Sequence, residues 1–225
     1  MLPVMVDPPC FLSLVESSIE VFNRETTGML IGHPRKRTIR GKPERVMALD
    51  VAFPIQTAAR RVFSVEPGNG AAFHRARSAI DSLGYRIVGE FHSHTNNHVA
   101  LSRDDLAYAR NALLESGADA WLELILGVRK KTYASPKRVG WIWRDYHKKA
   151  GCTVRITEDT GFDVTIGAFW VYHDAASGRV KWSEETVFIP WAKHYWVDPR
   201  RAARNGNGSF LHASGVRMPA GVYAR

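Results

Sequence analysis

Cysteines are few in this chain, long apolar runs are missing, and the N-terminus does not resemble a secretory leader. The chain contains two cysteines, Cys10 and Cys152, without any Cys-x-x-Cys spacing, which excludes a disulfide framework. No stretch approaches the ~18 uninterrupted apolar residues of a membrane span. The N-terminus has no basic region, and Pro8 and Pro9 interrupt its apolar residues, which is unlike a signal peptide. We therefore expect a cytoplasmic protein with no membrane partner.

Acidic residues are also few relative to basic ones. The chain has 22 Asp and Glu against 31 Lys and Arg, a formal net charge of +9. This charge attracts acidic partners, nucleic acid among them. The basic residues are scattered in short groups, without an aromatic platform or a base-reading motif. Nucleic acid is therefore a possible partner but not a favoured one.

The hydrophobic pattern changes its period along the chain. Apolar residues at helical spacing predict helices over residues 10–24, 71–84 and 102–117. Apolar and β-branched runs predict strands over residues 28–33, 45–55, 60–65, 85–94, 120–128, 138–146, 163–173 and 179–190. The segment 33–45, rich in charge, Pro and Gly, is predicted to be an exposed loop. Interleaved helices and strands predict an α/β fold, a mixed β-sheet packed with helices.

The length of 225 residues suits one domain with additions. We expect this domain, with variable insertions, over residues 1–195. The composition then changes to a basic stretch rich in Gly, Ala and Arg. We expect residues 196–225 to form a loosely ordered tail.

Two histidines and one aspartate form a candidate metal-binding group. His92 and His94 are two residues apart on a predicted strand, so their side chains share one face. Asp105 follows in the first turn of the next predicted helix. Zinc binds His nitrogen and carboxylate oxygen, and catalytic zinc sites use three protein ligands. A lone His-x-His pair is a weak signal, but with Asp105 it predicts a metal site.

The residues around this trio resemble a family motif. Glu25 stands three residues before Gly28 and the predicted strand 28–33, and His92-Ser93-His94 is followed at fixed spacing by Ser102 and Asp105. The order and spacing resemble the JAMM (MPN-plus) family of zinc metallopeptidases: an upstream Glu, His-Ser/Thr-His, seven residues, Ser, two residues, Asp. The resemblance covers roughly residues 10–128.

The resemblance implies a role for each matching residue. His92, His94 and Asp105 would bind Zn²⁺, with a zinc-bound water as the nucleophile. Glu25 would be the general base, and Ser102 would hold the water or donate to the oxyanion. The implied fold is that of MPN/JAMM domains, with a cytidine-deaminase-like architecture. The implied function is hydrolysis of amide bonds at the C-terminus of ubiquitin-like modifiers, in the manner of a deubiquitinase.

Several alternatives stay open at the level of single residues. Glu90 shares the face of the two histidines and could act as a base or as a partner of a ligand, although the family pattern favours Glu25. Ser102 and Asp105 also fit a structural N-cap. Two histidines with one carboxylate also suit non-haem iron. Thr95 replaces the Pro found in many family members, which is expected to loosen the following loop.

The function has alternatives too. Related peptidases process sulfur-carrier proteins or other peptides. A third possibility is a non-catalytic MPN scaffold or nucleic-acid-binding protein. Catalytically inactive relatives usually lack one or more of the metal-site residues. All five residues of the motif are present here: Glu25, His92, His94, Ser102 and Asp105. The sequence leaves the particular modifier, the linkage and the oligomeric state open.

Overall fold

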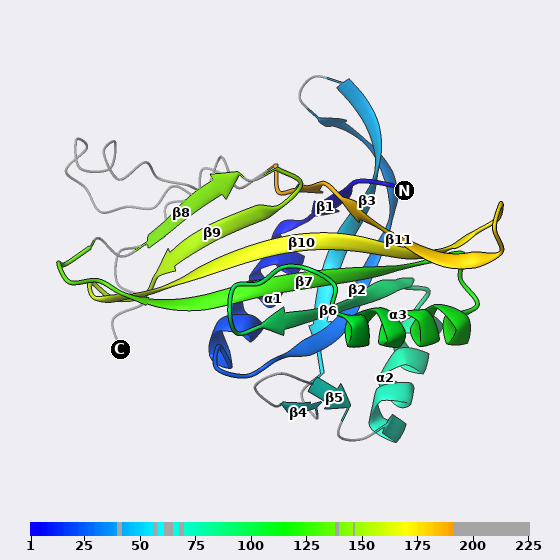
Figure 1. Cartoon of the computed structure of the whole chain (residues 1–225), viewed down its shortest axis with the longest axis horizontal. Helices are drawn as coiled ribbons and strands as arrows, with labels where there is room; N and C mark the ends of the chain where they lie inside the picture. Colours follow the sequence, from blue (N-terminus) through cyan, green and yellow to red (C-terminus); the bar gives the residue numbers. More distant parts are fainter. Residues whose placement is uncertain are drawn as a thin grey trace.

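A long mixed β-sheet forms the centre of the molecule (Figure 1). The computed structural model describes residues 1–39, 42–55, 58–60, 65–67, 70–137, 140–145 and 147–190. The sheet is ten-stranded, in the order β12-β1-β3-β2-β6-β7-β10-β9-β8, with β11 paired to β10. β1 is parallel to β3 and β12, and β6 is parallel to β7. The remaining pairs of this sheet are antiparallel, so the predicted α/β class with a mixed sheet is confirmed.

The helices and strands of the described residues follow one another as β1 (Val4–Val6), α1 (Pro8–Glu20), β2 (Thr27–Ile39), β3 (Lys42–Pro54), β4 (Ala58–Arg60), β5 (Val65–Pro67), α2 (Gly70–Ser82), β6 (Ile87–His94), α3 (Arg103–Ser116), β7 (Ala120–Thr132), β8 (Gly140–Asp145), β9 (Ala150–Arg155), β10 (Thr160–Asp174), β11 (Arg179–Glu185) and β12 (Val187–Phe188).

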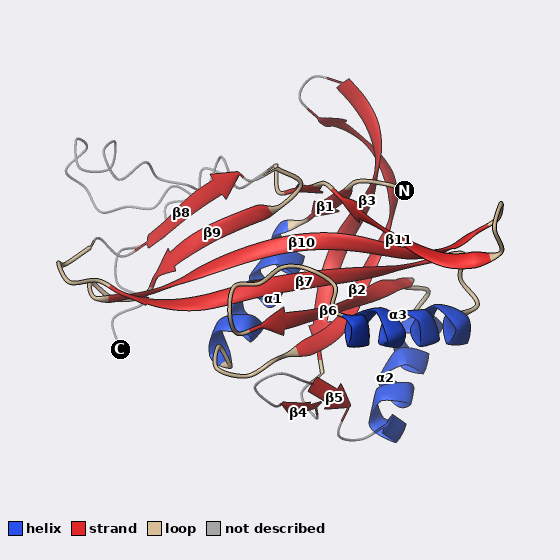
Figure 2. Cartoon of the chain, in the orientation of Figure 1, coloured by secondary structure: helices blue, strands red, loops and turns tan. Residues whose placement is uncertain are grey.

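The helices cover the two faces of the sheet (Figure 2). Side chains alternate between the faces along a strand, and β7 shows the division. Leu122, Leu124 and Leu126 point into the main core with α1. Trp121 points to the other face and packs with the apolar side of α3. His92 and His94 are out of phase with the core residue Phe91, so they face the side of α3.

Local signals set the limits of α3 as predicted. Ser102 is its N-cap, with an extended backbone (φ −76°, ψ 173°). Gly117 ends it in the left-handed conformation, with φ 63°, which glycine adopts without strain. Because Asp105 lies in the first turn, the cap also fixes where this carboxylate points.

The prediction of an exposed loop over residues 33–45 was wrong. β2 continues to Ile39 and β3 begins at Lys42, and the two pair from Arg35↔Val46 to Ile39↔Lys42. This two-stranded extension, residues 33–39 and 42–45, is called the ribbon below, and it projects from the body of the molecule (Figure 1). Pairing between strands decides its structure, and local composition, rich in charge and turn residues, does not report that pairing.

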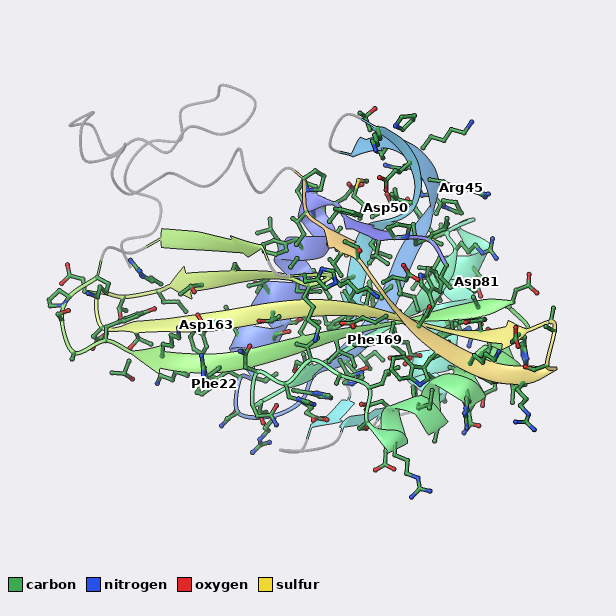
Figure 3. The ribbon with its side chains drawn as sticks, turned by 45° about the horizontal axis from the view of Figure 1, so that its top comes forward. Phe22, Arg45, Asp50, Asp81, Asp163 and Phe169 are labelled. Atoms are coloured by element: carbon green, nitrogen blue, oxygen red, sulfur yellow. The ribbon has the colours of Figure 1, made fainter. Side chains whose placement is uncertain are left out.

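Ion pairs hold the root of the ribbon to the body. The Arg35 guanidinium contacts Asp50 Oδ1 at 2.8 Å and Asp7 Oδ2 at 3.4 Å. Asp50 lies near the root, while Arg45 lies farther along the ribbon (Figure 3). The described cations beyond the root have no such partner. None of the ion pairs between described residues includes Lys36, Arg37, Lys42 or Arg45.

Some observed strands were not predicted, and some predicted segments lie outside the described residues. β1 and β9 have no counterpart among the predicted strands, because one is very short and the other begins with the small residues Ala150 and Gly151. The predicted strand 60–65 lies largely outside the described residues, as does the tail 196–225. None of the described helices has the length and apolar character needed to cross a membrane.

Candidate metal centre

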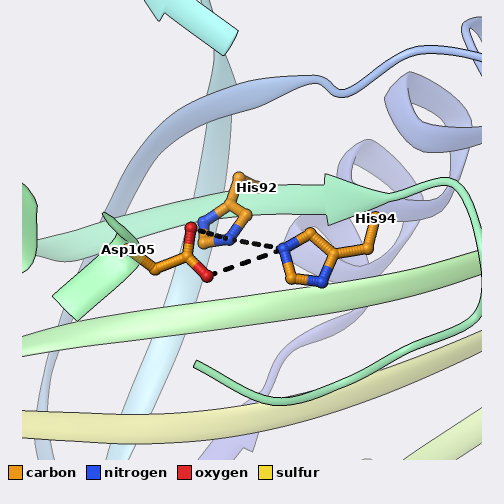
Figure 4. A group of neighbouring side chains, drawn as sticks. All are labelled: His92, His94 and Asp105. Carbon is orange, nitrogen blue, oxygen red and sulfur yellow. Dashed lines mark hydrogen bonds and ion pairs between the residues drawn. The ribbon is translucent and has the colours of Figure 1, made fainter. Parts of the chain in front are cut away.

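His92 and His94 occupy the end of β6 and bring two ring nitrogens together. The Nε2 atoms of the two rings lie 3.1 Å apart. Both side chains are partly buried, with exposed fractions of 11% for His92 and 13% for His94. Their rings are tilted by 50°, so both Nε2 atoms turn toward one point (Figure 4).

Each histidine has an acceptor at its other nitrogen. His94 Nδ1 lies 3.0 Å from the backbone carbonyl oxygen of His98, to which it can only donate. His92 Nδ1 lies 3.6 Å from Glu123 Oε2. Protons on both Nδ1 atoms leave a lone pair on each Nε2, because a neutral imidazole carries one N–H.

Asp105 completes the group from the first turn of α3. Its Oδ1 lies 3.3 Å from His92 Nε2, and its Oδ2 lies 3.7 Å from His94 Nε2. A capping box fixes this carboxylate: the Ser102 backbone N–H donates to Asp105 Oδ2 at 2.7 Å, and the Asp105 N–H donates to Ser102 Oγ at 3.1 Å. The structural cap and the metal-facing position therefore coexist in one residue.

This arrangement fits a metal cation. One ligand atom from each of the three residues lies within 4.8 Å of the others, and three lone-pair donors aimed at one point need a positive charge between them. In the absence of a metal, a proton on His92 would supply this positive charge. Burial lowers the pKa of His92, but the Asp105 and Glu123 carboxylates raise it more, to about 10. Despite its own burial, Asp105 has a pKa well below its usual range, held down by His92 and Ser102. His, His and carboxylate are zinc ligands.

Glu25 lies in the loop before β2, beside this group. Thr27 pairs with His92 across the β2–β6 ladder, and the Ser93 N–H donates to the Thr26 carbonyl at 2.9 Å, so the chain at Glu25 runs alongside the end of β6. Burial raises the pKa of Glu25 to about 7, with the charge of His92 lowering it and that of Asp105 raising it. A half-buried carboxyl with a pKa near neutrality is suited to accept and return a proton.

The other candidates fall in different places. Ser102 is exposed at the start of α3, where its Oγ caps the helix. Ser93 points away from the metal face, as predicted, and its Oγ accepts the Thr26 N–H at 3.0 Å. Glu90 is buried, with 5% of its surface exposed. Burial and the neighbouring Glu123 raise the pKa of Glu90 to about 8, although a hydrogen bond with Tyr108 lowers it.

The loop after His94 is held against the sheet, although it lacks the family's Pro. Asn97 adopts the left-handed conformation, with φ 60°. It passes so close to Gly127 that a Cβ there would lie 2.6 Å from the Asn97 carbonyl carbon. Lys149 Nζ donates to the Val99 carbonyl at 2.7 Å. These contacts fix the His98 carbonyl that supports His94.

Comparison with known proteins identifies the family. The family model described as prokaryotic homologues of the JAB domain (Prok-JAB) matches residues 7–144, and this range contains the three candidate ligand residues and Glu25. The chain belongs to this family. The resemblance to JAMM/MPN proteins is thereby confirmed.

The chain was also compared with curated proteins and with solved structures. No curated protein matches the chain. Among solved structures, protein DSY2949 from Desulfitobacterium hafniense is similar, with a TM-score of 0.45, 13% identity, and coverage of 83% of this chain and 92% of that one.

In this Prok-JAB protein the motif residues do not include every group at the site. Glu123 lies on β7, beyond the motif, in a stretch that predicts only a central strand. Its one sequence signal is that it is the only charged residue within the run 120–128. The His98 carbonyl gives no sequence signal, because any residue supplies a backbone oxygen.

Proposed function

We propose that this Prok-JAB protein is a zinc-dependent isopeptidase that hydrolyses amide bonds at the C-terminus of ubiquitin-like modifiers. The observation that carries the proposal is the convergence of His92 Nε2, His94 Nε2 and the Asp105 carboxylate, with Glu25 beside them. The substrate class is supported by the resemblance of the motif to JAMM isopeptidases.

The residues would divide the chemistry between them. A zinc ion held by His92, His94 and Asp105 would polarise the scissile carbonyl and make water acidic enough to react at neutral pH. Glu25 accepts the proton from the attacking water and delivers it to the amine nitrogen as the C–N bond breaks. The products are a carboxylate and a free amine. The Ser102 hydroxyl donates to the carbonyl oxygen, where negative charge develops.

The test is cleavage of a panel of ubiquitin-like conjugates, linear fusions and short C-terminal peptides by the zinc-loaded protein. Wild type should cleave isopeptide conjugates, and a chelator should abolish this. Glu25→Ala should keep its zinc and lose hydrolysis, whereas His92→Ala should lose both. Metal content is measured on the same samples, and reloading with Fe²⁺ or Mn²⁺ identifies the ion that supports the rate.

Three outcomes would contradict the proposal in different parts. Cleavage by Glu25→Ala at the wild-type rate removes Glu25 as the base. Cleavage of short peptides but not of conjugates replaces the isopeptidase with a peptide-processing enzyme. A zinc-loaded protein that cleaves nothing in the panel overturns the enzymatic proposal in favour of a non-catalytic scaffold.

A further inference from the structure

A buried carboxylate lies directly behind one of the two histidines. Glu123 has 2% of its surface exposed, and its Oε2 faces His92 Nδ1 at 3.6 Å. We propose that Glu123 is a positioning residue, which holds His92 in the orientation and tautomer that binds the metal. The inference rests on the proposed metal centre, but it concerns a residue outside the motif.

Sheet geometry brings the two side chains together. β6 and β7 are parallel neighbours, with Glu90 opposite Glu123 and His92 opposite Ile125. From Glu90 onward, the even-numbered residues of β6 point to the face of α3, as do the odd-numbered residues of β7. Glu123 therefore lies beneath His92 on the side away from the metal-facing Nε2.

A second contact fixes the carboxylate itself. Trp121 Nε1 donates to Glu123 Oε1 at 3.1 Å, which leaves Oε2 for His92. Trp121 has 2% of its surface exposed and packs with Ala109, Leu113 and Val171. The carboxylate is thus placed by the apolar contact between α3 and the sheet, and the same helix carries Asp105. Packing of α3 positions both a ligand and the support of another ligand.

A carboxyl buried as deeply as that of Glu123 needs polar partners. An ionised carboxylate buried this deeply is costly unless it is paired and hydrogen-bonded. Among the described residues, its ion-pair partner is His92. The pair places the imidazole N–H on Nδ1 and keeps the Nε2 lone pair for the metal, the arrangement in which an outer carboxylate orients a metal-bound histidine.

The two histidines differ in what supports them. His94 relies on a backbone carbonyl, which substitution of a side chain does not remove. His92 relies on the side chain of Glu123. A single substitution can therefore weaken one ligand specifically.

The chain supplies a matched control. Glu90 is also a buried carboxyl, it stands opposite Glu123 in the ladder, and it points to the same face. Its hydrogen bond goes to Tyr108 and not to a ligand. Glu90→Gln therefore removes a buried carboxylate from the same region without touching the contact to His92.

The experiment measures zinc affinity by competition with a chromogenic chelator, for wild type, Glu123→Gln, Trp121→Phe and Glu90→Gln. In a neutral Gln an NH2 donor replaces one of the two carboxylate oxygens, so either Trp121 or His92 faces a donor in place of an acceptor. Glu123→Gln should weaken zinc binding by ~10- to 100-fold, and Trp121→Phe by a smaller factor. Glu90→Gln should stay within about threefold of wild type. The visible spectrum of the Co²⁺-loaded protein should change in Glu123→Gln and not in Glu90→Gln.

The outcomes separate this inference from the proposed function. Unchanged zinc affinity in Glu123→Gln, or an equal loss in Glu90→Gln, would overturn the positioning role. If Glu123→Gln does not fold, as judged by circular dichroism, Trp121→Phe decides, and an unchanged affinity there counts against the inference. Zinc binding is read without substrate, so a wild type that binds zinc but cleaves nothing defeats the proposed function alone.

Discussion

The proposed role of Glu25 as general base comes with a cost in stability. Burial is the main cause that raises its pKa from 4.5 to about 7, so the folded protein holds this proton more tightly than the unfolded chain does. The stability of the metal-free protein therefore falls as the pH rises from the unfolded pKa to the folded one. Above that window the carboxylate is ionised in both states, and the whole cost is present.

Substitution of Glu25 should therefore stabilise the metal-free protein while it stops hydrolysis. Glu25→Gln should raise the free energy of unfolding at pH 8 by about 1 kcal/mol, a value discounted for partial exposure. At pH 4 the gain should vanish, because the carboxyl is then protonated in both states. Urea unfolding at the two pH values measures this, with the exposed Glu115→Gln as control. A loss of stability at pH 8 would contradict the assigned cost.

Ionisation of Glu25 should determine the acid side of the pH–rate profile. Glu25 accepts a proton only when it is ionised, so kcat/KM should fall as the pH drops. The midpoint for the metal-loaded enzyme should lie below 7, because a bound cation lowers the pKa of a nearby carboxyl. Initial rates between pH 4.5 and 8 on the best substrate would measure it. A profile that stays flat over this range would argue that Glu25 is not the base.

At the scale of elements, the start of α3 combines a cap with a ligand. Ser102→Ala removes the acceptor for the Asp105 N–H and should cost about 1 kcal/mol of stability. Ser102→Asp restores an equally good cap but has no hydroxyl to donate. We expect Asp to recover the melting temperature while hydrolysis remains ~100-fold low. If hydrolysis also recovers, the role of Ser102 is capping alone.

The elements also show which parts of the site the sequence can predict. His92, His94 and Asp105 lie within a short stretch whose strand, loop and capped helix all have local signals, and the structure brings these residues together. Glu123 is contributed by a neighbouring strand through β6–β7 pairing, which no local pattern specifies. The prediction of a loop at the ribbon was wrong for the same reason. The two strands of the ribbon stabilise each other, and each alone has the composition of a loop.

At the scale of the whole molecule, the cations of the ribbon lie apart from the candidate metal centre. The candidate metal centre lies where the end of β6 meets the start of α3, whereas the ribbon extends β2 and β3 away from the body (Figure 1). Lys36 stands directly opposite Arg45 across the ribbon, and like charges so placed are destabilising. Residues 33–45 contain no Phe, Trp or Tyr, so the ribbon lacks the aromatic anchors typical of protein interfaces.

Cations without aromatic anchors suit phosphate groups, whose binding is electrostatic and independent of sequence. We expect the full chain to bind duplex DNA weakly at low salt, with an affinity that falls steeply as salt rises. Lys36→Glu with Arg45→Glu should remove most of this binding, and the slope of log affinity against log salt should become shallower by about two. Arg110→Glu with Arg179→Glu makes the same change in net charge on the body of the molecule and should matter far less. Fluorescence anisotropy of labelled DNA across a salt series would measure both pairs. Equal losses from the two pairs would mean that net charge alone attracts DNA, and that the ribbon has no special part in it.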